Sequence, residues 1–183
     1  FVVGEVCNIV CVVMAVPISH KLGKRVTFAA SCIGMAVLSI LFFYLPCTNV
    51  GFITMLLLQI LISVCTGIIS PLIWSMYADV ADYATIKDKT SSTGLIFSSG
   101  SMAQKFGGAI AGSAVLWLFA AFGLVPNATT QTPDAILGMK LTMSWIPAAV
   151  AVLMVVIMVA YPLTKSKMKE INTKLKSIRK IED

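Results

Sequence analysis

A lysine in the middle of an apolar stretch is the strongest chemical signal in the sequence. Lys105 lies thirteen residues after Ser92, in an apolar block that runs from about Ser92 to Leu124. At 1.5 Å per residue this is about 20 Å into a helix, near the middle of a membrane. A central lysine costs roughly 2.5–3.5 kcal/mol on insertion scales. It therefore needs either a carboxylate partner, as a structural lysine, or a polar cavity that binds substrate or joins a coupling-ion network, and the second hypothesis is favoured.

The neighbours of Lys105 support a cavity. Small and polar residues recur at spacings of three and four, which places them on one face of a helix: Gly94, Ser98, Ser101, Lys105, Gly108 and Gly112. Gln104 lies beside this stripe. The two last glycines form a GxxxG pattern that permits close helix contact, so a packing seam explains the glycines. It does not explain Ser101, Gln104 and Lys105 together, and these three are predicted to bind substrate.

Two further residues are candidates for the same cavity. Ser70 and Trp74 lie one helical turn apart in the preceding apolar block. Trp74 has two interpretations, an anchor at the membrane interface or a ring in the cavity on which a sugar stacks. Glu5, in the first apolar block, is another candidate cavity residue.

Two carboxylates, Asp79 and Asp82, are spaced i,i+3 near the end of the third block. A carboxylate at a helix C-terminus opposes the macrodipole, so each is expected to have a basic partner. Four basic residues on the same side of the membrane can supply one: Lys24, Arg25, Lys87 and Lys89. Such pairs would latch one face of a transporter in one conformation and open in another. The alternative is that the two carboxylates are solvated loop charges.

The elements that carry these residues are predicted to be membrane helices. The chain has 183 residues, of which 58% are hydrophobic and 12% charged, about half the charged fraction of a soluble domain. The apolar residues gather in five long blocks: 1–19, 26–45, 50–77, 92–124 and 135–163. Backbone groups in lipid must be satisfied within the segment, and the blocks lack the alternation of barrel strands, which makes the fold class all-α integral membrane.

Two prolines lie inside the expected helices. Pro71 and Pro147 each remove a backbone hydrogen bond and crowd the carbonyl four residues earlier, at Gly67 and Met143. Each is therefore expected to bend its helix, either for packing or as a gating hinge.

The loops predict the orientation. Charged connections alternate with nearly neutral ones, and seven basic residues follow Leu163. By the positive-inside rule this places residue 1 outside and Asp183 in the cytoplasm. Residues 164–183 have apolar residues at helical spacing among lysines, which predicts a cytoplasmic, basic, amphipathic tail. Because the positive charge lies beside a membrane helix, its expected partner is the lipid bilayer and not nucleic acid.

Enzymatic and metal chemistry have little support. The sequence has no Walker loop, no zinc-ligand spacing, no Ser-His-Asp set and a single histidine. Its five cysteines include no CxxC pair, so they are interpreted as small membrane-compatible side chains. We therefore expect no enzyme, and neither a metal nor a cofactor bound by this chain.

The residues already described resemble the glycoside–pentoside–hexuronide:cation symporter family, part of the major facilitator superfamily, of which melibiose permease is a member. The similarity covers essentially the whole chain, and its most specific part is an Ala-Asp-x-x-Asp-Tyr segment followed by a mid-helix lysine. The matching stretches are Leu22–Arg25, Trp74–Tyr83, Lys87, Thr93–Ser99, Ala103–Gly108 and Pro126–Asn127.

This resemblance implies a twelve-helix transporter that moves a sugar or glycoside together with Na⁺, Li⁺ or H⁺ by alternating access. Residues 1–163 resemble helices eight to twelve, so the chain is expected to be a C-terminal fragment that works with N-terminal helices of the same protein. The family's cation-binding carboxylates belong to that N-terminal half. The resemblance also implies that Lys105 lies near the sugar site, facing the cation site, and that Ser101 lines the sugar pocket. Ser70 departs from the family pattern, because melibiose permease has an aromatic residue there.

Two other functions stay open. A transporter of the same fold could carry a lipid or a drug, which would favour an apolar path over one lined by Ser70, Ser101, Gln104 and Lys105. A non-transporting accessory module would instead associate through Gly108 and Gly112 and would tolerate loss of Lys105. The expected location is the bacterial inner membrane, which the chain crosses several times.

Overall fold

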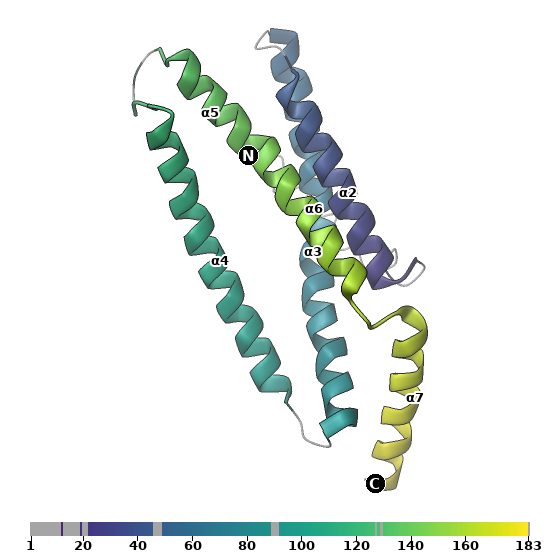
Figure 1. The fold of residues 1–183 in the computed structure, drawn as a ribbon. Coiled ribbons are helices and arrows are strands. Elements are labelled where there is room, and N and C mark those ends of the chain that lie inside the picture. Colours follow the sequence, from purple (N-terminus) through teal and green to yellow (C-terminus); the bar gives the residue numbers. More distant parts are fainter. Residues whose placement is uncertain are drawn as a thin grey trace.

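The computed structural model describes residues 12, 19, 22–45, 49–88, 92–126, 128 and 130–182. Most of the first expected block, including Glu5, lies outside the described residues, as does Lys89. The regular elements of the described part are helices (Figure 1): α2 (Lys24–Phe43), α3 (Asn49–Asp88), α4 (Thr93–Ala121), α5 (Pro133–Met143), α6 (Trp145–Ala160) and α7 (Lys165–Glu182). This confirms the all-helical fold class.

Three segments of the described chain are long and apolar enough to cross a membrane: Lys24–Phe43, Ile53–Lys87 and Pro133–Ala160. They correspond to the second, third and fifth expected blocks. Helix α4, with 29 residues, has the length to cross. It is not among the three, and its sequence shows why: Gln104, Lys105 and the glycine and serine residues of its stripe lower its mean hydropathy.

Helix α3 is longer than expected. The third block was predicted to end near Tyr77, but α3 continues unbroken to Asp88, so Asp79 and Asp82 lie on a helix and not in a loop. No glycine or proline interrupts residues 78–88, and Lys87 in the last turn complements the helix dipole. The 40 residues of α3 span about 60 Å, roughly twice the hydrocarbon thickness. Pro71 lies inside this continuous helix.

The fifth block is divided in two. Helix α5 ends at Met143 and α6 begins at Trp145, with Ser144 between them at φ −121° and ψ −75°. Pro147 has no N–H to give to the carbonyl of Met143 and its ring crowds that carbonyl, which accounts for a break at this point. The hydroxyl of Ser144 donates to the carbonyl of Lys140, and the buried Ser144 thereby has its own polar group satisfied. The helix expected over this block is therefore interrupted at Ser144, three residues before Pro147.

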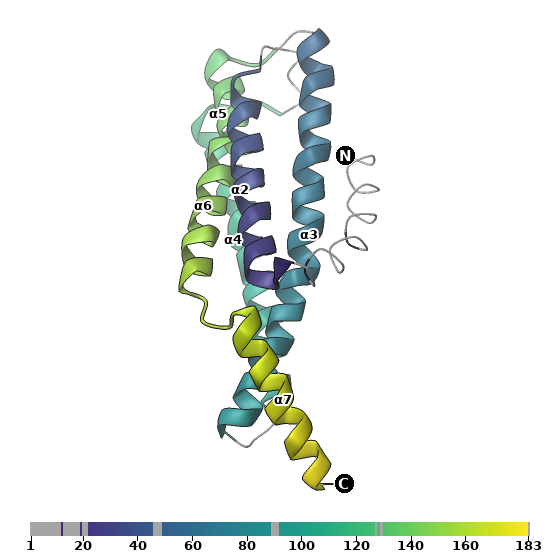
Figure 2. The same ribbon diagram turned by 90° about the vertical axis from the view of Figure 1, so that its right-hand side faces the viewer.

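The most tightly packed part of the molecule is the trio α2, α3 and α6. Helix α2 contacts both of the others along much of its length and lies between them in Figure 2. One core cluster joins all three helices: Phe28, Cys32, Ile69, Leu72, Met76 and Met158. A second consists of small residues, Ala36, Ala148 and Ala151, which allow α2 and α6 to approach closely in the manner typical of membrane helices.

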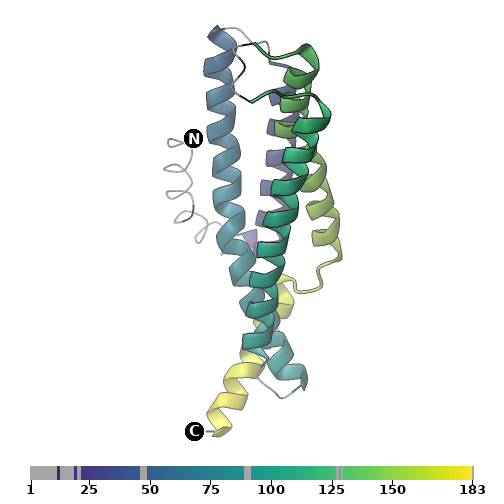
Figure 3. The same ribbon diagram turned by 90° about the vertical axis from the view of Figure 1, so that its left-hand side faces the viewer.

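Helix α4 stands apart from this trio in Figure 1 and lies in front of it in Figure 3. It contacts α3 and α5, and Gly100 is its one buried residue. Just beyond the end of α4, Phe122 lies against Gly138 of α5, where an added Cβ would come within 2.6 Å of the ring. The middle of α4 is exposed between these two ends.

Helix α7 packs against the C-terminal part of α3. It continues beyond the trio at the lower end of Figure 2. Ile171 is buried on its inner side, as is Leu163 in the connection before it, while Glu170 and Lys174 pair on its exposed side at 2.7 Å. The apolar face of the tail is therefore covered in part by the chain itself.

The helices alternate in direction (Figure 1). The first residues of α2 and α4 and the last residues of α3 and α6 therefore lie toward the same end of the molecule. We call this the basic end, because it carries Lys24, Arg25, Lys87 and the lysines of α7. The residues predicted to latch the transporter lie here, whereas Lys105 lies in the middle of α4.

Candidate functional site

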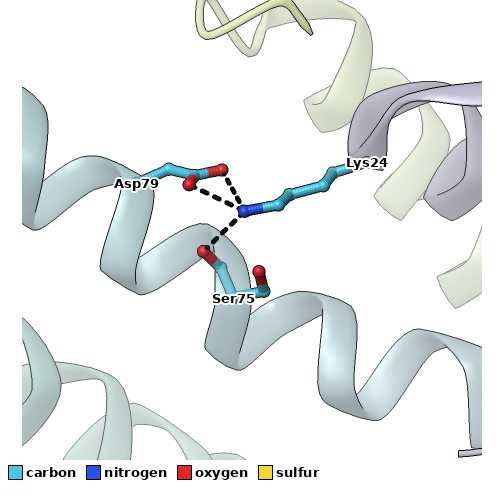
Figure 4. Close-up of polar contacts among 3 residues, drawn as sticks. All are labelled: Lys24, Ser75 and Asp79. Atoms are coloured by element: carbon cyan, nitrogen blue, oxygen red, sulfur yellow. Dashed lines mark hydrogen bonds and ion pairs between the residues drawn. The ribbon is translucent and has the colours of Figure 1, made fainter. Parts of the chain in front are cut away.

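An ion pair joins α2 to α3 at the basic end (Figure 4). The ammonium of Lys24 lies 2.7 Å from both carboxylate oxygens of Asp79 and also donates to the backbone carbonyl of Ser75 at 3.3 Å. The side chain of Lys24 is 32% exposed and that of Asp79 only 12%. The pair is thus partly desolvated, and removal of one partner would leave a poorly hydrated charge.

The other residues predicted to form a latch are arranged differently. Arg25 donates to the carbonyl of Val159 on α6 at 2.6 Å, so it fastens the start of α2 to the end of α6. Neither Asp82 nor Lys87 forms an ion pair with any described residue. Of the partners considered from the sequence, the structure selects Lys24 for Asp79. Whether the pair acts as a gate stays a prediction.

An aromatic cluster lies where α4 crosses α3. The rings of Trp74 and Phe97 stack with centroids 6.2 Å apart and an interplanar angle of 15°. Tyr77 meets both of them edge to face. Gly100 makes the crossing possible, because a Cβ there would come within 2.5 Å of the Tyr77 ring. Three rings and one glycine therefore lie at the contact between the two helices.

A pocket of about 260 Å³ adjoins this cluster, between α3 and α4. It is lined by Ser70, Ile73, Trp74, Tyr77, Ala103 and Gln104. Three residues predicted to bind substrate from two separate helices, Ser70, Trp74 and Gln104, are thus brought together. The pocket offers an aromatic face, a hydroxyl and an amide, which is a suitable set for the apolar face and the hydroxyl groups of a sugar.

Lys105 and Ser101 do not line this pocket. Lys105 is exposed in the middle of α4, and Ser101 is half-buried. Lys105 forms no ion pair with the described residues, so no carboxylate of this part of the chain provides the partner that a structural lysine would need. Gly108 and Gly112 are likewise open, with nothing within 4 Å of an added Cβ. No described helix of this chain forms the packing seam expected of the GxxxG pattern.

Sequence reasoning did not single out Tyr77, Phe97 or Gly100. Helical spacing offered a signal, since Tyr77 is three residues after Trp74 and Gly100 three residues after Phe97, which places each pair on one helix face. What the spacing does not reveal is that these two faces meet. Among the described residues no group of three or more His, Cys, Asp or Glu gathers in a metal-binding arrangement.

Comparison with known proteins defines the class. The sequence model of the family described as MFS/sugar transport protein matches residues 1–165, so the chain belongs to that family. It is a multi-pass membrane protein of the major facilitator superfamily, a group of transporters and not of enzymes. The family relationship inferred from the Asp79–Asp82 and Lys105 segments is confirmed.

The chain is also similar to three curated proteins. It is 28% identical over 162 residues to the glucuronide carrier protein homolog of Escherichia coli (strain K12), covering 88% of this chain and 35% of the relative. It is 28% identical over 160 residues to the putative glycoside/cation symporter YagG of the same organism, covering 86% of this chain and 34% of the relative. An uncharacterized 29.9 kDa protein of Pseudescherichia vulneris is 28% identical over 159 residues, covering 87% of this chain and 57% of the relative. The chain spans about a third of the length of the first two.

Proposed function

We propose that this chain is the C-terminal part of a secondary active transporter that carries a sugar or glycoside together with Na⁺ or H⁺ by alternating access. Membership of the MFS/sugar transport family supports the substrate class. The name of one relative, a putative glycoside/cation symporter, supports coupling to a cation. In this proposal residues 1–163 are helices eight to twelve of a twelve-helix protein of the bacterial inner membrane, and the basic end and residues 164–183 face the cytoplasm.

The observation that carries the proposal is the exposed, polar middle of α4. Gln104 and Lys105 are both exposed there, and Gln104 also lines the pocket that contains Ser70 and Trp74. An exposed lysine at mid-membrane depth is costly unless it faces a polar cavity. We therefore assign this surface to a central cavity completed by the N-terminal helices.

The chemical roles follow from the side chains. Lys105 and Gln104 offer hydrogen-bond donors to sugar hydroxyls, and Lys105 also balances carboxylates across the cavity. Trp74 is 37% exposed while its ring stacks on Phe97, so it offers a held aromatic surface to the pocket. Ser70 and Ser101 add hydroxyls on two helices. The coupling cation would bind carboxylates of the N-terminal half.

The Lys24–Asp79 pair supplies a gate in this proposal. It joins α2 to α3 at the end assigned to the cytoplasm, with Arg25 tied to α6. A pair of this kind can hold one face closed in one conformation and separate in another. Asp82, one helical turn further along α3, becomes available for a second contact when the helices move.

The test is uptake of a panel of labelled glycosides by cells that express the intact protein, with and without Na⁺ and with and without a proton gradient. We expect uptake of one glycoside that collapses when the coupling ion is removed. Lys105→Ala should abolish this uptake while membrane expression stays near normal. Lys167→Ala, which removes the same charge from the exposed surface of α7, is the matched control and should transport normally. Normal uptake by Lys105→Ala would refute the assignment.

One alternative has a structural observation in its favour. Gly108 and Gly112 are open on the surface of α4, which suits an accessory module that associates through close helix contact. That function predicts that Gly108→Leu abolishes association with a partner and that Lys105→Ala is harmless. Absence of sugar uptake by a well-expressed protein would instead favour a different cargo, a lipid or a drug, to be measured in the same cells.

A further inference from the structure

A second pocket lies at the basic end, outside the candidate sugar site. Its volume is about 310 Å³, and it opens between the first turn of α2, the C-terminal part of α3 and the first turns of α7. The lining residues are Ser19, Gly23, Lys24, Arg25, Asp79, Leu163, Lys165, Met168, Lys169 and Asn172. Four of them are basic and only Asp79 is acidic, so the lining carries a net of three positive charges.

The single carboxylate is already engaged. Both oxygens of Asp79 lie 2.7 Å from the ammonium of Lys24, so the only carboxylate of the lining is already paired. Arg25 gives one of its five N–H donors to the carbonyl of Val159. Lys165 and Lys169 lie one turn apart on α7, so their side chains lie on the same face of that helix. The pocket therefore gathers four cationic side chains from two helices around a single carboxylate.

The tertiary structure holds these two helices together. An added Cβ at Gly23 would lie 3.6 Å from Cβ and from Cδ of Lys165, which shows that α7 begins directly beside the start of α2. Gly23 has φ +91°, a conformation that a glycine adopts without strain. The first-turn N–H groups of α2 and α7 add their partial positive charge at the same place.

The position relative to the membrane indicates the ligand. The apolar span of α2 begins at Lys24 and that of α5 and α6 ends at Ala160. The pocket therefore lies at the ends of two candidate membrane spans, where lipid headgroups are expected. Exposed apolar side chains adjoin it. Leu22 and Val26 line a neighbouring pocket with Gly23, Arg25 and Lys165, and the exposed Val159 accepts a hydrogen bond from Arg25 through its carbonyl. Lysine and arginine clusters of this kind at the ends of membrane helices attract anionic headgroups.

We propose that this pocket binds the phosphate of an anionic phospholipid, with the acyl chains lying on the exposed surface beside Leu22, Val26 and Val159. Arg25, Lys165 and Lys169 contact the phosphate, and the lipid thereby fastens α7 to α2 next to the Lys24–Asp79 pair. A phospholipid is proposed as the ligand instead of free phosphate because the charged pocket adjoins an exposed apolar surface.

Titration of the purified intact protein in dodecylmaltoside with phosphatidylglycerol, followed by native mass spectrometry, tests the proposal. Each lysine near an anionic headgroup contributes about fivefold in affinity, so Lys165→Ala/Lys169→Ala should weaken binding about 25-fold. The matched control is Lys167→Ala/Lys174→Ala. It removes two lysines from the same helix that line a different pocket, with Glu170 and Ile171, and it should change affinity less than threefold. Lys165→Arg/Lys169→Arg should bind like the unmodified protein, which separates lost charge from misfolding.

Three outcomes would overturn the proposal. Equal loss of binding in the two alanine pairs would mean diffuse attraction to the basic tail instead of a site. Equal binding of the zwitterionic phosphatidylcholine would mean that the headgroup charge is not recognised. Displacement of phosphatidylglycerol by inorganic phosphate at millimolar concentration would assign the pocket to a free phosphate. Each outcome is measured without transport, so it is independent of the proposed sugar symport.

Discussion

Helices α2 and α4 both consist mainly of apolar residues but have different surroundings. Six residues of α2 are buried, and they lie along one face: Thr27, Phe28, Ser31, Cys32, Ala36 and Ser39. Helix α4 is nine residues longer than α2, yet Gly100 is its one buried residue. Among the described residues, α2 therefore packs along one face against its neighbours, whereas α4 is left largely open. The residues with polar chemistry at mid-membrane depth belong to the helix that is left open.

This contrast separates two kinds of requirement. In the trio of α2, α3 and α6, close packing and an ion pair determine how the helices fit, and a polar surface would be costly. On α4, Lys105 and Gln104 make insertion of the helix into a membrane less favourable. Such a cost is expected where the side chains bind a substrate instead of stabilising the fold. The four predictions that follow test this division, from the largest expected effect to the smallest.

The core of the trio should be the most sensitive to truncation. Phe28 is 4% exposed, so Phe28→Ala creates a cavity between α2 and α3. We expect the free energy of unfolding to fall by about 2–3 kcal/mol, less than for a phenylalanine in the core of a soluble protein. The loss is smaller because the side chain would otherwise face lipid and not water, so that mainly the cost of the cavity remains. Thermal unfolding of the intact protein in detergent measures it. Phe106→Ala, on the exposed part of α4, is the matched control and should change stability by less than about 1 kcal/mol.

The ion pair should show coupling between the two helices. Lys24→Met and Asp79→Asn are each expected to cost about 1–3 kcal/mol, between the values for exposed and buried pairs. Because each single change leaves the other partner unpaired, the double variant should lose less than the sum. Asp82→Asn, which breaks no ion pair among the described residues, is the control. Strict additivity in this cycle would show that the contact contributes nothing.

The crossing of α4 over α3 depends on one missing side chain. Gly100→Ala places a Cβ within 2.5 Å of the Tyr77 ring, so the ring must shift within the stack that it forms with Trp74 and Phe97. We expect a net loss of about 1 kcal/mol, since overpacking outweighs the better helix propensity of alanine. Gly107→Ala, with open space at its Cβ, should be neutral or stabilising by up to about 1 kcal/mol. A loss of equal size at Gly107 would indicate that another helix of the intact protein packs there.

The smallest effect concerns the outside of α7. The hydrogen bond and the charge of Lys174 lower the pKa of Glu170 below its ordinary value. A lowered pKa in the folded state means that this pair stabilises α7 above the ordinary pKa of a glutamate and that the stabilisation is lost as the pH falls through the lowered value. Carbon-13 NMR titration of the Glu170 carboxyl should show this pKa, and Lys174→Ala should return it toward its ordinary value. A titration that Lys174→Ala leaves unchanged would contradict the pairing.

Several features were predictable because their causes are local. Long apolar blocks predicted membrane helices, and Pro147 predicted a lost backbone hydrogen bond close to the break between α5 and α6. The end of α3 was missed because the polar residues after Tyr77 were interpreted as a loop. Hydropathy marks where a helix leaves the membrane, not where it ends, and Ala78–Asp88 contains no residue that stops a helix.

The site shows the same division. That Lys105 lies in an apolar helix follows from the sequence, as does the need of Asp79 for a basic partner. The choice of Lys24 instead of Lys87 as the partner of Asp79 does not follow from the sequence. It depends on antiparallel packing that brings together residues 55 positions apart. The convergence of Ser70, Trp74 and Gln104 on one pocket also depends on how α3 and α4 cross.

Sequence alone determined the membrane helices, the transporter family and the polar character of α4, since these are set by residue type and spacing along one helix. The tertiary structure decided which helix faces meet: the three rings around Gly100, the partner of Asp79 and the basic pocket between α2 and α7. The physical reason is that periodicity specifies the face of each helix, whereas contacts between helices depend on the shapes of two surfaces from distant parts of the chain.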